Sequence, residues 1–239
     1  MRESFWKNTT PGTKFSIKSL RLDRCNFSAT ALENLLNSCP NLEFLKYEHD
    51  EEKHEHPFRP GQFDNALANL KAVLKELVLY RTALEPGSLV TAEDFEIIKS
   101  LKEFQKLTTI FITANLLLGP QKMEGSLWYE ASRNFAKRVE TQPLTSCLPL
   151  SLEHLKLKNC GMDIFEQASE LVEAKGVVVP NLKGLIIEFV HIRNHYTGGR
   201  SFITRAWSNQ LALGTSSQAV KELDSLCKKK GVMLDVWYN

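Results

Sequence analysis

Residues 152–160 read LEHLKLKNC, and this stretch decides the fold of the 239-residue chain. Its first six residues have the form Leu-x-x-Leu-x-Leu, and close variants of that motif occur six times along the sequence. The apolar positions of the six motifs are Ile17-Leu20-Leu22, Leu42-Leu45-Tyr47, Leu74-Leu77-Leu79, Leu107-Ile110-Ile112, Leu152-Leu155-Leu157 and Leu182-Leu185-Ile187. A motif that returns in this way indicates repeated units, each of which buries its apolar residues by stacking on its neighbours.

The motif resembles the strand signature of leucine-rich repeat proteins, whose units typically span about 20–29 residues. Here successive motifs begin 25, 32, 33, 45 and 30 residues apart, so most units are longer than that. Long units leave room for a helix after each strand. The sequence therefore predicts an α/β leucine-rich repeat solenoid, a short right-handed βα arc of about seven parallel strands whose last strand follows Gly231.

Apolar residues at helical spacing follow most of the predicted strands. These stripes lie in residues 31–36, 63–73, 95–104, 164–172 and 220–227. Ser28 is a suitable N-cap for the first helix, and Thr91 with Asp94 resembles a capping box before the third. Gly231 follows the last stripe and predicts the end of that helix.

The predicted domain organisation is a lead segment at 1–14 and one repeat domain at 15–239. Two long insertions interrupt the repeat, near 116–145 and 191–216. Insertions in repeat proteins form loops, often on one face, and can carry binding function. An amphipathic helix is predicted in the first insertion, and the alternative is an irregular loop; the apolar residues behind this prediction are Trp128, Tyr129, Phe135 and Val139.

The composition argues against several classes of protein. With 30 basic and 28 acidic residues the net charge is only +2, which gives no reason to expect a nucleic acid or a membrane as partner. No apolar run approaches the roughly 18 residues that span a bilayer. The five cysteines form no CxxC pair, so we expect reduced thiols and a cytoplasmic or nuclear location.

The sequence offers little support for catalysis or for a bound cofactor. It has no G-x-S-x-G elbow, no P-loop and no dinucleotide-binding glycine motif, so we predict that the chain is not an enzyme. Residues 48–56, EHDEEKHEH, resemble a metal site most closely, but nothing elsewhere completes a ligand set. We predict a solvated loop there, with no metal and no cofactor. Cys25 and Cys160 each follow a strand motif by three residues, and we predict structural roles for both.

The residues between the motif leucines face the opposite side of the sheet, which in such a solenoid is the concave side. Several of these residues are more apolar than a solvated face requires, and aromatic residues flanked by charge are typical of protein-binding surfaces. The alternative is that an insertion folds over this face and covers it. The candidate partner-binding residues are Arg21, Phe44, Lys46, Val78, Tyr80, Thr109, Phe111, His154, Lys156, Ile186 and Glu188.

The units that begin at Ser16 and at Leu148 resemble repeats of the ribonuclease-inhibitor-like kind, and most closely the repeat regions of fungal F-box/leucine-rich repeat proteins. That resemblance implies a protein-interaction module that recognises the substrate of a ubiquitin ligase. No Leu-Pro-x-Glu-x-Leu opening of an F-box and no polar capping unit precedes the first repeat, so we expect this chain to be part of a longer protein. Ubiquitin-ligase components are expected partners if an F-box lies upstream; the alternative is a scaffold or inhibitor that covers its partner protein.

Overall fold

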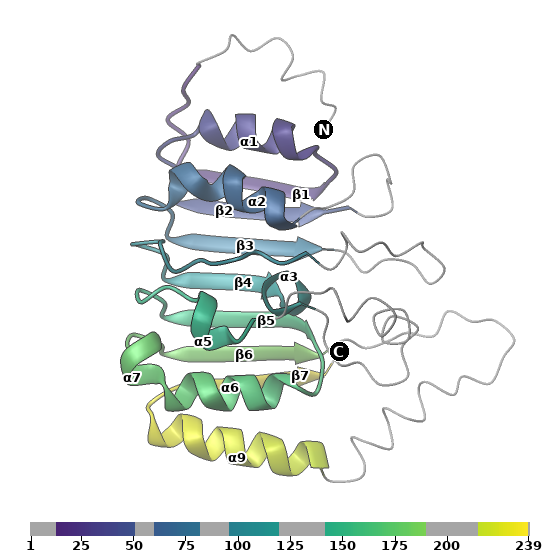
Figure 1. The fold of residues 1–239 in the computed structure, drawn as a ribbon, viewed down its shortest axis with the longest axis vertical. Coiled ribbons are helices and arrows are strands. Elements are labelled where there is room, and N and C mark those ends of the chain that lie inside the picture. The colour runs from purple at the N-terminus through teal and green to yellow at the C-terminus, as the bar shows by residue number, and fades with distance from the viewer. Residues whose placement is uncertain (1–12, 51–59, 82–95, 120–141, 190–214, 239) are drawn as a thin grey trace, which may run out of the picture.

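Seven parallel strands form one sheet in chain order in the computed structural model, which describes residues 13–50, 60–81, 96–119, 142–189 and 215–238. Each strand pairs with the next in sequence, so the units stack side by side (Figure 1). This arrangement confirms the predicted α/β solenoid. The strands are β1 (Ser19–Cys25), β2 (Phe44–His49), β3 (Glu76–Arg81), β4 (Thr109–Thr113), β5 (His154–Cys160), β6 (Gly184–Phe189) and β7 (Met233–Tyr238).

The helices lie on one face of this sheet (Figure 1). They pack on their neighbours in the same order as the strands, with α1 against α2 and α6 against α9. None of them is long and apolar enough to cross a membrane, as far as the described residues go. The helices are α1 (Ala29–Asn37), α2 (Pro60–Leu67), the 3-10 turn η3 (Ala68–Leu70), α3 (Ala114–Leu118), α5 (Leu144–Cys147), α6 (Ile164–Glu173), α7 (Lys175–Val178) and α9 (Thr215–Lys229).

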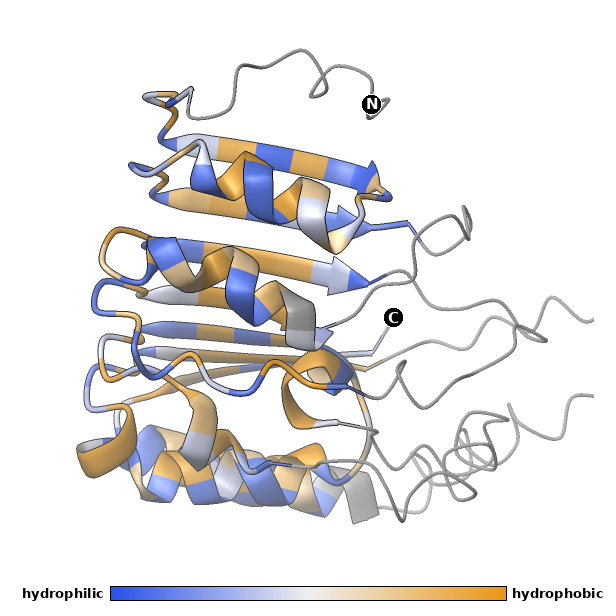
Figure 2. Cartoon of the chain, turned by 45° about the horizontal axis from the view of Figure 1, so that its top comes forward, coloured by the Kyte–Doolittle hydropathy of each residue, from blue (hydrophilic) through white to orange (hydrophobic). Residues whose placement is uncertain are grey.

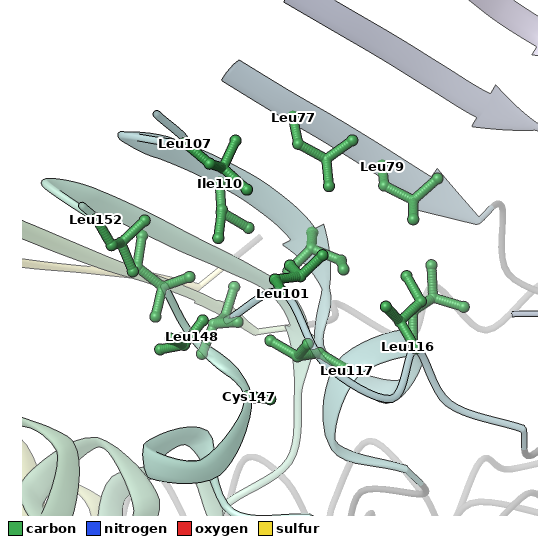
Figure 3. Packing of buried hydrophobic residues seen from close by; sticks show 14 of the residues in the cluster. Leu77, Leu79, Leu101, Leu107, Ile110, Leu116, Leu117, Cys147, Leu148 and Leu152 are labelled. Atoms are coloured by element: carbon green, nitrogen blue, oxygen red, sulfur yellow. The ribbon is translucent and has the colours of Figure 1, made fainter. Parts of the chain in front are cut away.

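The core lies between the sheet and the helices. Hydrophilic and hydrophobic residues alternate along the strands (Figure 2), and the motif leucines supply the hydrophobic side. Leu77 and Leu79 are fully buried, and they belong to the same core cluster as Leu107, Ile110 and Leu116 (Figure 3). Because each leucine row continues in register from strand to strand, every inner unit is covered by its neighbours.

The predicted helix ends are observed at both termini of the solenoid. The hydroxyl of Ser28 accepts a hydrogen bond from the backbone N–H of Ala31 at 3.3 Å, and therefore caps α1. At the other end Gly231 adopts a φ of 63°, and the N–H of Val232 donates to the carbonyl of Cys227 at 2.8 Å. These bonds close α9 and redirect the chain into β7.

The helix predicted over 95–104 is wrong for the described residues 96–104, which contain no helix. The N–H of Ile98 donates to the carbonyl of Leu116, and the N–H of Leu101 to that of Cys147, both at 2.8 Å. Ile98 and Leu101 therefore bond to α3 and α5, and the bond within the segment from the N–H of Phe104 to the carbonyl of Leu101, at 3.1 Å, closes only a turn. Its apolar side chains still enter the core, because Ile98, Leu101 and Phe104 are buried. Thr91 and Asp94 lie outside the described residues.

The two predicted insertions fall largely outside the described residues. Residues 116–118 belong to α3 and contribute buried leucines, and residues 144–145 begin α5. Residues 120–141 and 190–214 are not described. The predictions for Trp128, Tyr129, Phe135 and Val139 therefore stay predictions.

Candidate functional site

The candidate site is the face of the sheet opposite to the described helices, which corresponds to the predicted concave face. Strand register arranges its side chains in three rows across the sheet. All eleven predicted partner-binding residues lie in these rows. The first row is Ser19, Phe44, Glu76, Thr109, His154, Gly184 and Met233; the second is Arg21, Lys46, Val78, Phe111, Lys156, Ile186 and Asp235; the third is Glu48, Tyr80, Thr113, Lys158, Glu188 and Trp237.

Charged and aromatic groups of β1 and β2 form one cluster on the concave face. The Arg21 guanidinium lies 5.0 Å from the centre of the Phe44 ring, a cation–π distance. The Lys46 ammonium forms an ion pair with Asp23 and lies 3.9 Å from a carboxylate oxygen of Glu48. Both cationic side chains are thus held by neighbours on the sheet.

A second cluster spans β3 to β7 and is centred on Glu188. The Glu188 carboxylate lies 2.8 Å from the Lys156 ammonium and 3.5 Å from that of Lys158. Each lysine also lies over an aromatic ring, Lys156 at 4.7 Å from the Trp237 centre and Lys158 at 4.9 Å from the Tyr80 centre. We call this chain of contacts, Tyr80–Lys158–Glu188–Lys156–Trp237, the Glu188 cluster.

The Glu188 cluster mixes buried and accessible groups. The Glu188 side chain is only 8% exposed, whereas Lys158 is 37% exposed. Trp237 is 47% exposed, and its ring is available beside Lys156. Burial, together with the negative charges of Glu188 and Glu48, raises the pKa of Tyr80 to about 12, so the phenol stays neutral at ordinary pH.

The middle of the face is apolar. Val78 and Phe111 are register partners on β3 and β4, and Lys156 separates Phe111 from Ile186. Val78 is mostly buried, while Phe111 and Ile186 are partly exposed. Thr113, which strand alternation also assigns to this face, is buried, and its hydroxyl accepts a hydrogen bond from the N–H of Arg81.

The His154 ring, at the start of β5, occupies space that is open because its register partner on β6 is Gly184. A Cβ added at Gly184 would lie 2.9 Å from Nδ1 of His154, so the imidazole lies directly against that glycine. His154 is exposed, and together with Lys156 and Lys158 it forms a line of basic groups along β5.

The described residues show no group of three or more His, Cys, Asp or Glu side chains that are close enough to hold a metal ion. His49 is buried and lies 2.9 Å from the Tyr47 hydroxyl through Nδ1, so it is part of the core. His54 and His56 lie outside the described residues. No set of metal ligands can therefore be assigned among the described residues.

The cysteines are buried, and their environments disfavour the thiolate. Burial raises the pKa of Cys147 to about 12 and that of Cys227 to about 11, and it also raises the pKa of Cys160 and Cys39. A nucleophilic cysteine needs a lowered pKa, so none of these four groups has the properties of a catalytic thiol.

Lys158 and Trp237 are not among the eleven predicted partner-binding residues. The structure gives both a place in the Glu188 cluster. Lys158 reaches the Tyr80 ring from two strands away, past the small side chain of Thr113 on β4. A signal was present in the sequence, since a lysine and a tryptophan at concave positions flank Glu188 in register.

Comparison with known proteins agrees with this architecture. A family model described as a leucine-rich repeat domain matches residues 3–227. Neither the curated proteins nor the solved structures include a significant match. Domains of the matching family are generally non-catalytic protein-interaction modules. Because the match covers almost the whole chain, and seven parallel strands stack in chain order, the chain belongs to the leucine-rich repeat domain family.

Proposed function

We propose that this chain binds a partner protein on its concave face, as a non-catalytic interaction module. The observation that carries the proposal is the Glu188 cluster, in which the accessible Trp237 lies beside Lys156, and the Glu188 carboxylate pairs with both Lys156 and Lys158. Tryptophan, tyrosine and arginine are enriched among the residues that dominate protein-binding energy.

The contacts of this face support binding because they order its long side chains in advance. Immobilising a flexible side chain on binding costs about 0.5–1.5 kcal/mol. Lys156 and Lys158 each have a carboxylate and an aromatic ring as neighbours, and Arg21 lies on Phe44. A partner that contacts these groups meets side chains that have already lost part of their freedom.

The finer role that we propose is recognition of the substrate of an F-box-type ubiquitin ligase, in the cytoplasm or the nucleus. The resemblance of the repeat units to fungal F-box/leucine-rich repeat proteins supports the ligase role. The buried, protonated thiols are compatible with a reducing compartment.

The experiment that tests the concave face is quantitative affinity purification with mass spectrometry, using the natural full-length chain. We expect specific partners to be lost when Tyr80 and Phe111 are both replaced by Ala. A matched control is Lys221→Ala, which removes an exposed side chain from α9 on the helical side. Thermal melting of each variant is needed first, because a large loss of stability would show that Tyr80 and Phe111 are covered in the native protein.

Two outcomes are separable in this experiment. If the partners of the double variant equal those of the wild type, the concave face is not the binding surface. If partners are lost but no ubiquitin-ligase scaffold is among those of the wild-type chain, the interaction module stands and the ligase role fails.

A further inference from the structure

We infer that the partner of this face is a protein segment that is acidic at both ends and apolar in the middle, and that it lies along β5 in an extended conformation. Its carboxylates would contact His154 and Lys158, and its central apolar side chain would contact Phe111 and Ile186. This inference rests on the proposed function and specifies the chemistry of the partner.

The basic side chains in this part of the concave face lie on one strand. Between β3 and β7, all the basic residues of the concave rows lie on β5: His154, Lys156 and Lys158. The concave positions of β4 are Thr109, Phe111 and Thr113, which carry no charge, and those of β6 contribute only Glu188. A basic stripe therefore runs along one strand, bordered by neutral side chains on the β4 side.

One carboxylate faces two ammonium groups within the basic stripe. Glu188 carries one negative charge, and it lies within ion-pair distance of two ammonium groups. Lys156 is the closer, at 2.8 Å, and only 16% of its side chain is exposed. Lys158 is more distant, at 3.5 Å, and 37% exposed. Lys158 is thus the ammonium that is most available for a carboxylate of a partner.

The basic side chains of β5 have a regular spacing along the strand. At a rise of about 3.3 Å per residue, His154 and Lys158 are about 13 Å apart along the strand, and Lys156 lies between them. Phe111 and Ile186 flank Lys156 in register on either side. An extended segment also presents every second side chain to the same side. In the pattern acidic-x-apolar-x-acidic, the two acidic side chains would therefore reach His154 and Lys158. The apolar side chain would lie over the mostly buried Lys156, between Phe111 and Ile186.

Acidic side chains on strands further out, on both sides of this stripe, argue against a nucleic acid as the occupant. Glu48 and Glu76 lie on β2 and β3, and Asp235 lies on β7. A phosphate backbone carries a negative charge at every nucleotide and needs a wider basic surface. With a net charge of only +2, the chain does not supply one.

The test uses synthetic fluorescent peptides and the full-length chain, with anisotropy as the measurement. Twelve-residue peptides from a random displayed library are selected on the wild-type chain, and the selected pattern is then compared with variants in which Asp and Glu become Asn and Gln. We expect enrichment of acidic-x-apolar-x-acidic, and weaker binding at about 0.15 M salt than at lower salt. A fluorescent single-stranded oligonucleotide of the same length is the second probe.

Three variants locate the site. Lys158→Gln is expected to weaken the selected peptide about two- to fivefold, the size of an exposed ion pair, and Lys158→Glu about tenfold or more. Gly184→Ala keeps every charge but displaces the His154 ring. It is expected to lower the affinity for the selected peptide by as much as a substitution of His154 itself. Lys221→Gln on α9 is the control that removes an equal charge elsewhere and should change nothing.

The outcomes separate this inference from the proposed function. If the selected peptides have no acidic residues but lose affinity with Phe111→Ala, the inference of an acidic partner is overturned. The concave face then remains the binding surface. Peptides that are insensitive to every concave substitution would overturn both. Equal binding of the oligonucleotide, lost with Lys158→Glu, would overturn the inference in favour of a nucleic acid.

Discussion

Arg24 and Asn159 adopt the same left-handed backbone conformation at the same place in two repeat units, with φ angles of 50° and 58°. Each residue immediately precedes a buried cysteine, Cys25 in β1 and Cys160 in β5. Strand register shifts at both sites, between Leu22 and Cys25 and between Lys158 and Cys160. The left-handed residue is therefore a bulge that turns the following cysteine into the core.

Asn159 provides the first prediction, because it can be replaced by residues that differ in their tolerance of a positive φ. A left-handed conformation costs an ordinary L-residue roughly 1–2 kcal/mol, and a β-branched side chain fits there least well. We expect Asn159→Val to lower the free energy of unfolding by about 1–2 kcal/mol, and Asn159→Gly to leave it nearly unchanged. Urea denaturation measures both. Equal stabilities of the two variants would contradict the strain at this bulge.

The second prediction concerns the leucines of the motif. Leu77 is fully buried between β2 and β4, so Leu77→Ala should lower the free energy of unfolding by about 2–5 kcal/mol, through lost burial and the cavity left behind. Leu150→Ala is the control, because Leu150 is 62% exposed and its truncation should have little effect. Thermal or urea unfolding followed by circular dichroism compares them, and similar losses would contradict this assignment of the core.

Most of the fold was predictable because each unit repeats the same physical solution. The motif leucines needed only their spacing to be assigned to the core, and Ser28 and Gly231 needed only local chemistry. The helix predicted over 95–104 was wrong because partners elsewhere in the chain, and not local spacing, decide the conformation of that segment. Its apolar spacing fits a helix, but α3 and α5 offer bonding partners to Ile98 and Leu101 that belong to more distant parts of the chain.

The candidate site was predictable in position but not in detail. Strand alternation decides which side chains share a face, and it placed all eleven candidates in the concave rows. It does not decide how far a side chain reaches across the sheet. Lys158 contacts both Glu188 and the Tyr80 ring, and the contact with Tyr80 crosses β4, where Thr113 has a small, buried side chain.

The third prediction concerns the five buried thiols. Burial raises the pKa of four of them, to about 12 for Cys147 and about 11 for Cys227, so little thiolate exists in the folded protein. Ellman's reagent at about pH 8, near the ordinary thiol pKa of about 8.5, should react slowly with the native chain and rapidly with all five cysteines in denaturant. A fast native reaction would show a thiol that is accessible without unfolding.

The last prediction uses the raised pKa of Tyr80, which burial and the charges of Glu188 and Glu48 bring to about 12. The unfolded chain should release this proton near the ordinary tyrosine pKa of about 10. The contribution of the raised Tyr80 pKa to the free energy of unfolding is therefore fully present below about pH 10, and it is lost as pH rises towards about 12. Absorbance at the tyrosinate band, as wild type minus Tyr80→Phe, should show a late titration step. A step near pH 10 would mean that the Tyr80 hydroxyl is solvated, and that the Glu188 cluster is looser than its contacts indicate.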